Sequence, residues 1–135
     1  MLGLVIITHA GLAAEFKAAR EHVVGPQQQL ETLSIGPDDD VEQRRQQLIE
    51  AVARADSGAG VVVLTDMFGG TPSNLAISVL NQVKTEVIAG VNLPMLIKLA
   101  EVRGKMNLPE AALAAQDAGR RYIRVASVEL AGGAA

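Results

Sequence analysis

The residues best suited to chemistry in this chain are a histidine near the start and an aspartate near the middle, His9 and Asp66. A neutral imidazole carries one N–H donor and one nucleophilic lone pair, and a carboxylate bound to the donor nitrogen fixes which nitrogen has which role. Asp66 could orient His9 in this way and stabilise the positive charge that develops when the free nitrogen attacks a phosphorus atom. The two residue types are therefore suited to nucleophilic attack by the histidine on a phosphoryl group.

The turn that follows the aspartate has the composition of an anion cradle. Gly69 and Gly70 allow a sharp turn and leave their N–H groups uncovered, while Thr71 and Pro72 are typical of an N-cap and a first helical residue. A helix N-terminus carries partial positive charge. A phosphoryl group on the histidine would then meet the N–H groups around Gly69, Gly70 and Thr71, and the scheme requires neither a metal nor a cofactor.

Alternating strands and helices must position these groups. Apolar runs rich in β-branched residues predict strands at residues 2–8, 30–35, 61–65 and 85–89, and alternation predicts a late strand at 122–128. Helical periods and caps predict helices at 12–24, 41–55, 72–83, 95–103 and 109–119. The order predicts a single α/β domain over residues 1–130, a mostly parallel sheet with helices on both faces, and a frayed tail at 131–135.

Two helices have apolar positions that we expect to face inward. In the first helix they are Leu12, Phe16, Ala19 and Val23, and in the third they are Leu75, Ile77, Val79 and Leu80. The acidic triplet 38–40 favours a helix start over a metal site, because acidic residues are favourable at a helix N-terminus.

Polar residues gather at one predicted edge of the sheet. In open parallel sheets, ligands bind beyond the carboxyl ends of the strands, near the point where the strand order reverses. His9, Asp66 and Asn92 each follow a predicted strand at that edge. The further residues expected along the same edge are Thr8, Phe68, Thr71 and Ser73.

Each of these features also has an ordinary structural explanation. A single histidine at a strand end can be structural, an aspartate before glycines can form local turn bonds, and the Gly-Gly-Thr-Pro turn can simply cap a helix. His22 has no companion motif and is expected to have a surface or structural role. The coincidence of His9 and Asp66 at one edge is what favours a functional pair.

Composition excludes several function classes. The chain of 135 residues has a formal net charge of −3, and it lacks a long Lys/Arg cluster, which argues against a nucleic-acid partner. No apolar run approaches a membrane span, the first residues lack a basic signal-peptide region, and a cytoplasmic location is expected. The absence of cysteine excludes thiol chemistry and disulfides. P-loop, dinucleotide-binding and serine-hydrolase motifs are also missing.

Three segments together resemble one protein family. Residues 5–9, 65–74 and 89–96 are similar to the mannose-family (fructose, mannose and sorbose class) IIA component of the bacterial phosphoenolpyruvate-dependent sugar phosphotransferase system, and the resemblance spans about residues 2–128. It implies that phospho-HPr phosphorylates His9, on Nε2, that Asp66 holds the other ring nitrogen, and that the phosphoryl group passes to a histidine of a IIB partner during sugar uptake. It also implies a homodimer in which the 122–128 strand pairs antiparallel and is exchanged between subunits.

The sequence departs from the family pattern at two site positions. Phe68 stands where some members have tryptophan, and Ala10 stands where some have glycine after the histidine. Some relatives continue into a IIB domain, so we expect a separate IIB partner here. Two alternatives stay open: a regulatory phosphorelay or binding module without sugar transport, and the phosphocarrier subunit of a dihydroxyacetone kinase.

Overall fold

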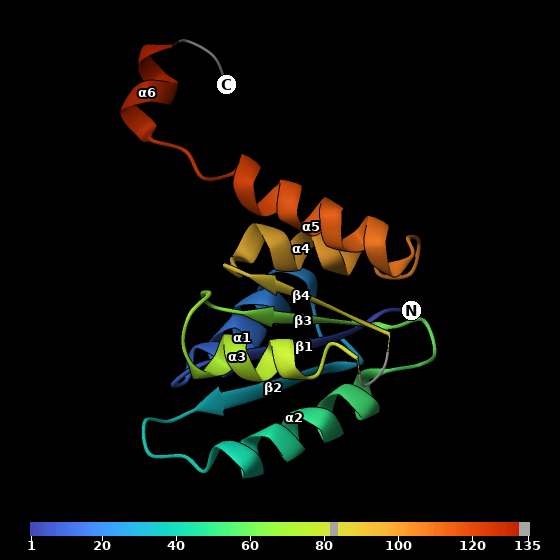
Figure 1. Ribbon diagram of the computed structural model, residues 1–135. Coiled ribbons are helices and arrows are strands. Elements are labelled where there is room, and N and C mark those ends of the chain that lie inside the picture. The colour runs from blue at the N-terminus through green and yellow to red at the C-terminus, as the bar shows by residue number, and fades with distance from the viewer. Residues whose placement is uncertain (82–83, 133–135) are drawn as a thin grey trace.

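The computed structural model describes residues 1–81 and 84–132, in which strands and helices alternate through most of the chain (Figure 1). The strands are β1 (Gly3–His9), β2 (Leu30–Ile35), β3 (Val61–Thr65) and β4 (Thr85–Ala89). The helices are α1 (Leu12–Val24), α2 (Val41–Ala55), α3 (Thr71–Ser78), α4 (Leu93–Val102), α5 (Leu108–Arg121) and α6 (Ala126–Ala131). None of these helices is long and apolar enough to cross a membrane.

The four strands form one parallel sheet in the order β2-β1-β3-β4, which confirms the predicted α/β class. Ile7 of β1 lies opposite Leu33 of β2 and opposite Thr65 of β3. The chain runs from β1 through α1 to β2, and it then returns through α2 to β3 on the other side of β1. The strand order therefore reverses between β1 and β3, and the carboxyl ends of these two strands are the expected place for a ligand site.

Helices cover both faces of the sheet (Figure 1). Leu4 and Ile6 of β1 face a core formed with α1, α4 and α5, whereas Val5 and Ile7 face a second core formed with α2 and α3. Successive side chains of a strand point to opposite faces, so a strand buried on both faces must be apolar throughout. That requirement explains the continuous apolar runs of β1 and β3.

The helix predicted at residues 72–83 is shorter in the structure. Helix α3 ends at Ser78, and Gln82 and Val83 lie outside the described residues. Leu75 and Val79 are buried as expected, but the prediction for Ile77 was wrong, because its side chain is exposed. Side chains two residues apart in a helix point to nearly opposite sides, so Leu75 and Ile77 cannot both face the sheet.

The buried face of α1 also differs from the expected one. Leu12 and Val23 are exposed, whereas Ala13 and Arg20 are buried. Phe16 packs against the core as expected. The apolar pattern missed Arg20, because an arginine can bury its long methylene stem among apolar side chains once its head group finds an acceptor.

The predicted strand at 122–128 is wrong for the single chain. Residues 122–125 are irregular and α6 begins at Ala126, on a segment that extends away from the body of the molecule (Figure 1). A strand needs a neighbouring strand for its backbone hydrogen bonds, while a helix satisfies them within itself, so a segment without a neighbour favours a helix. The tail predicted at 131–135 overlaps the end of α6 and its neighbour Gly132, and residues 133–135 lie outside the described residues.

Candidate active site

His9 and Asp66 meet at the carboxyl edge of the sheet. His9 is the last residue of β1, and Asp66 follows the last residue of the neighbouring strand β3. The ring Nδ1 of His9 lies 2.9 Å from Asp66 Oδ2, and the backbone N–H of His9 donates to the same oxygen at 3.0 Å. The site that the sequence predicted from two strand ends is thus one hydrogen-bonded pair at the point where the strand order reverses.

The other carboxylate oxygen of Asp66 is held by its own neighbours. The backbone N–H of Met67 donates to Oδ1 at 3.1 Å, and the buried hydroxyl of Thr65 donates to it at 3.4 Å. Sequence reasoning did not include these two residues, although an aspartate at the start of a turn is a known signal for local backbone bonds. With both oxygens engaged, the carboxylate plane has little freedom to turn away from the histidine.

Hydrogen bonding keeps Asp66 ionised. Partial burial acts to raise the pKa of Asp66, but the hydrogen bonds from the His9 backbone and ring outweigh it, so the pKa lies below the ordinary value of an aspartate. An ionised Asp66 can only accept, so the neutral His9 ring must carry its proton on Nδ1. The lone pair is then on Nε2.

Nε2 of His9 faces Gly70 and the start of α3. A Cβ atom added at position 70 would lie 3.0 Å from Nε2, which shows how closely the backbone passes the ring. Gly70 has φ of +128° and Gly69 has φ of +79°, backbone conformations that favour glycine. The His9 side chain is 47% exposed, so a group could approach Nε2 from solvent.

The N-terminus of α3 lies beside the ring without a side-chain cap. Gly70 is its N-cap, with no side chain to cover the first N–H groups of the helix, and Pro72 follows in the first turn. Ser73 is buried and its hydroxyl donates to the Gly70 carbonyl at 3.2 Å, so it supports the turn, while Thr71 is exposed. This geometry suits an anion bound to Nε2, because uncapped N–H groups and the helix dipole both favour negative charge.

Three of the predicted edge residues have side chains that form no hydrogen bond with His9 or Asp66. Thr8 is buried, and its hydroxyl accepts from the Ala13 N–H at 2.7 Å in the first turn of α1. Asn92 caps α4 through Met95 N–H at 3.1 Å and donates to the Gly119 carbonyl at 3.0 Å. Phe68 is 67% exposed on the surface beside α3.

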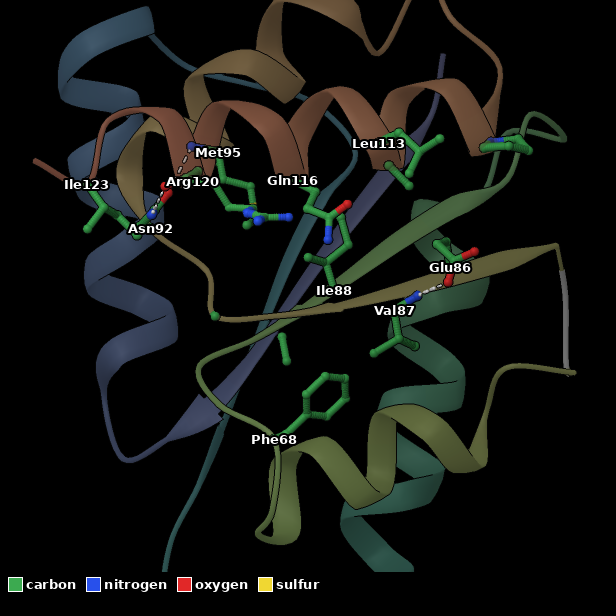
Figure 2. A pocket seen from close by; sticks show the side chains of 15 residues that line it. Phe68, Glu86, Val87, Ile88, Asn92, Met95, Leu113, Gln116, Arg120 and Ile123 are labelled. Carbon is green, nitrogen blue, oxygen red and sulfur yellow. Dashed lines mark hydrogen bonds between the residues drawn. The ribbon is translucent and has the colours of Figure 1, made fainter.

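Phe68 and Asn92 both line a groove beside the edge strand β4, as Figure 2 shows. The groove has a volume of about 620 Å³ and runs between β4 and α5. Neither His9 nor Asp66 lines it. The molecule therefore presents two neighbouring features, a shallow polar site on β1 and β3 and a groove along β4.

Comparisons with known proteins agree with this architecture. The chain is 30% identical over 125 residues to the mannose-specific EIIAB component of the phosphotransferase system of Escherichia coli K12, covering 91% of this chain and 39% of that protein. It therefore spans about two fifths of the length of that relative. It is 27% identical over 108 residues to the sorbose-specific EIIA component of Lacticaseibacillus casei, covering 79% of this chain and 78% of that protein.

Solved structures give the same result. The phosphotransferase system component EIIA from Streptococcus agalactiae superimposes with a TM-score of 0.86 at 21% identity, over 95% of this chain and 99% of that one, which shows a shared fold. The IIA protein associated with the fucose utilization operon of Streptococcus pneumoniae has a TM-score of 0.81 at 28% identity, over 95% of both chains. Residues 3–116 match the family model described as the fructose IIA component of the phosphotransferase system, and the chain belongs to this mannose-type EIIA family.

Proposed function

We propose that this protein is a phosphocarrier whose His9 Nε2 accepts a phosphoryl group and passes it on. The observation that carries the proposal is the hydrogen bond of 2.9 Å between His9 Nδ1 and Asp66 Oδ2, which leaves Nε2 as the nucleophilic nitrogen beside Gly70. The lone pair of Nε2 attacks phosphorus as the bond from phosphorus to the donor nitrogen breaks. Asp66 stabilises the positive charge that develops on the ring.

The start of α3 completes the site. Backbone N–H groups around Gly69, Gly70 and Thr71, with that of Ser73 in the first turn, would donate to the phosphoryl oxygens. The absence of a side-chain cap on α3 supports this assignment, because the helix N-terminus then has room for an external anion. Transfer onward reverses the first step, and Asp66 holds the same ring nitrogen in both directions.

The donor that we propose is the phosphohistidine of phospho-HPr, and the acceptor is a histidine of a IIB component, in the cytoplasm during sugar uptake. Membership of the EIIA family supports both partners. Exposed apolar side chains close to the pair in sequence also suit a protein docking surface, since Leu12, Met67 and Phe68 are each about half exposed or more.

Radiolabelled phosphoenolpyruvate, enzyme I and HPr test the first transfer. We expect one acid-labile phosphate per chain, and none in His9→Ala. The matched control is His22→Ala, because His22 is the other histidine and is exposed on α1. Equal labelling of His9→Ala and the unchanged protein would refute the proposal.

A second transfer experiment separates this function from a regulatory role. Labelled protein is mixed with the IIB protein encoded nearest to its gene, and we expect the label to move to that protein within one turnover. Label that stays on His9 while the affinity for a regulator changes would favour a regulatory module. Label that moves to a dihydroxyacetone kinase subunit would favour that alternative.

We also propose that the protein is a homodimer in which the 122–131 segment packs on the second copy. Its apolar side chains extend into solvent: Tyr122, Ile123, Val125, Val128 and Leu130 are each more than half exposed. β4 is one of the two edge strands of the sheet, and the groove lies beside it. In a two-fold dimer, the apolar segment of each copy would cover the strand edge of the other copy.

Molar mass in solution tests the dimer. The unchanged protein should have twice the mass of the chain by light scattering, and the double substitution Val128→Asp with Leu130→Asp should give the mass of one chain. Val41→Asp is the control, because Val41 is a comparably exposed apolar residue on α2. A single-chain mass for the unchanged protein at micromolar concentration would rule the dimer out.

A further inference from the structure

Two arginines of this chain, Arg20 and Arg103, are buried. Arg20 of α1 has no exposed surface, and Arg103, which follows the last residue of α4, is 3% exposed. Arg20 Nε donates to the Leu96 carbonyl at 3.1 Å, which ties α1 to α4. Arg103 Nε donates to the Leu2 carbonyl at 2.9 Å, and its Nη2 donates to the Gln29 carbonyl at 2.9 Å.

These carbonyl bonds leave three guanidinium nitrogens without an acceptor. Within residues 1–81 and 84–132, Arg20 Nη1, Arg20 Nη2 and Arg103 Nη1 are buried and have no hydrogen-bond partner. Buried polar atoms in folded proteins are rarely left without one, because an unpaired donor in the interior loses its hydration and receives nothing in exchange.

Neither side chain forms an ion pair with a described residue. Burial and the charge of Arg20 lower the pKa of Arg103 to about 10, so Arg103 is a cation at neutral pH and the positive charges of the two side chains repel each other. Glu21 acts on Arg20 only through its charge, without a hydrogen bond. A water molecule could accept from these nitrogens, but it would not balance two buried positive charges.

We propose that Arg20 and Arg103 together hold one small inorganic anion of the size of chloride. The anion accepts from the three free nitrogens and neutralises the repulsion between the two guanidinium groups. Both side chains are enclosed, which favours a monatomic ion over phosphate or a carboxylate metabolite. Arg103 lies at the amino ends of β1 and β2, where it donates to the carbonyls of Leu2 and Gln29, so the site is separate from His9 and independent of the proposed phosphoryl transfer.

Thermal unfolding of the intact protein tests the site in solution. Sodium gluconate is replaced by sodium chloride at constant ionic strength and constant protein concentration. A bound ion raises Tm in a saturable way, by about 5 °C at ten times its Kd for a chain of this size. Arg20→Met and Arg103→Met should each abolish the rise, whereas the exposed control Arg54→Met and the His9→Ala variant should keep it. A chloride-dependent rise in Tm that persists in both Arg20→Met and Arg103→Met would overturn the proposal.

Crystals of the unchanged protein grown with sodium bromide decide the question without any variant. We expect an anomalous peak within hydrogen-bonding distance of both guanidinium groups. Density at that place without anomalous signal would identify water and overturn the anion site, and so would the absence of any density between the two side chains. This result stands even where an arginine variant fails to fold.

Discussion

Two pairs of residues at the same edge of the sheet have different roles. One is His9 with Asp66, and the other is Asn92 with Gly119. His9 and Asp66 end adjacent strands and bind each other, with Nε2 of the histidine left open beside Gly70. Asn92 follows the edge strand β4, and α4 begins at the next residue, so its side chain is used to cap that helix and to hold α5. The comparison shows that the segment after a strand decides whether a polar side chain at its end is available for chemistry.

The largest effect should come from Asp66→Asn. The amide can still accept a hydrogen bond from His9 but carries no negative charge, so the ring is less well stabilised as it becomes positive. We expect phosphorylation by phospho-HPr to slow by about 100-fold or more. Rapid-quench labelling measures the rate of phosphorylation. A change of less than about two-fold would show that Asp66, like Asn92, has a purely structural role.

Gly70→Ala should have the next largest effect. The new methyl group would lie 3.0 Å from His9 Nε2, and alanine is strained at a φ of +128°. Gly69→Ala is the matched control, because its φ is also positive but a Cβ there meets nothing within 4 Å. Both variants should lose about 1–2 kcal/mol of stability in urea unfolding, and only Gly70→Ala should also slow phosphorylation, by about tenfold. Equal phosphorylation rates in the two variants would show that the contact with His9 is unimportant.

Asn92→Ala should lower stability without lowering activity. Loss of the α4 cap costs about 1 kcal/mol in the free energy of unfolding, whereas labelling of His9 should continue at the unchanged rate. Asn92→Asp keeps an acceptor for the Met95 N–H but loses the donor to Gly119, so it should recover part of the stability. A slower rate of labelling in a stable Asn92 variant would mean that the two pairs form a single site.

The smallest effect should come from Ala10→Gly. Ala10 follows His9 with φ of +49°, a left-handed conformation that glycine adopts without steric cost. We expect a gain of about 0.5–1 kcal/mol in the free energy of unfolding. Ala14→Gly on the exposed side of α1 should have the opposite sign, a loss of about 1 kcal/mol. A loss of stability in both variants would show that the left-handed backbone at Ala10 carries no steric cost.

The successes and failures of the sequence-based predictions have identifiable causes. The bounds of β2, β3 and β4 were predicted correctly, because apolar runs between turns are a local signal. The inward faces of α1 and α3 were partly wrong, since Arg20 is buried with a bond to the distant Leu96 carbonyl and Ile77 is exposed. At the candidate site, the pairing of His9 with Asp66 followed from strand ends alone, but the bonds from Thr65 and Met67 depended on the turn geometry.

By itself, the sequence determined the parallel α/β class, the bounds of β2, β3 and β4 and the two side chains that meet at the switch point. These follow from local periodicity and from the rule that parallel strands end at a common edge. Only the tertiary structure decided that Thr65 and Met67 hold Asp66, that Asn92 faces α5, and that the last segment of the single chain is helical. It also decided that two arginines are buried together, because such contacts join residues far apart in the chain and depend on how the helices pack.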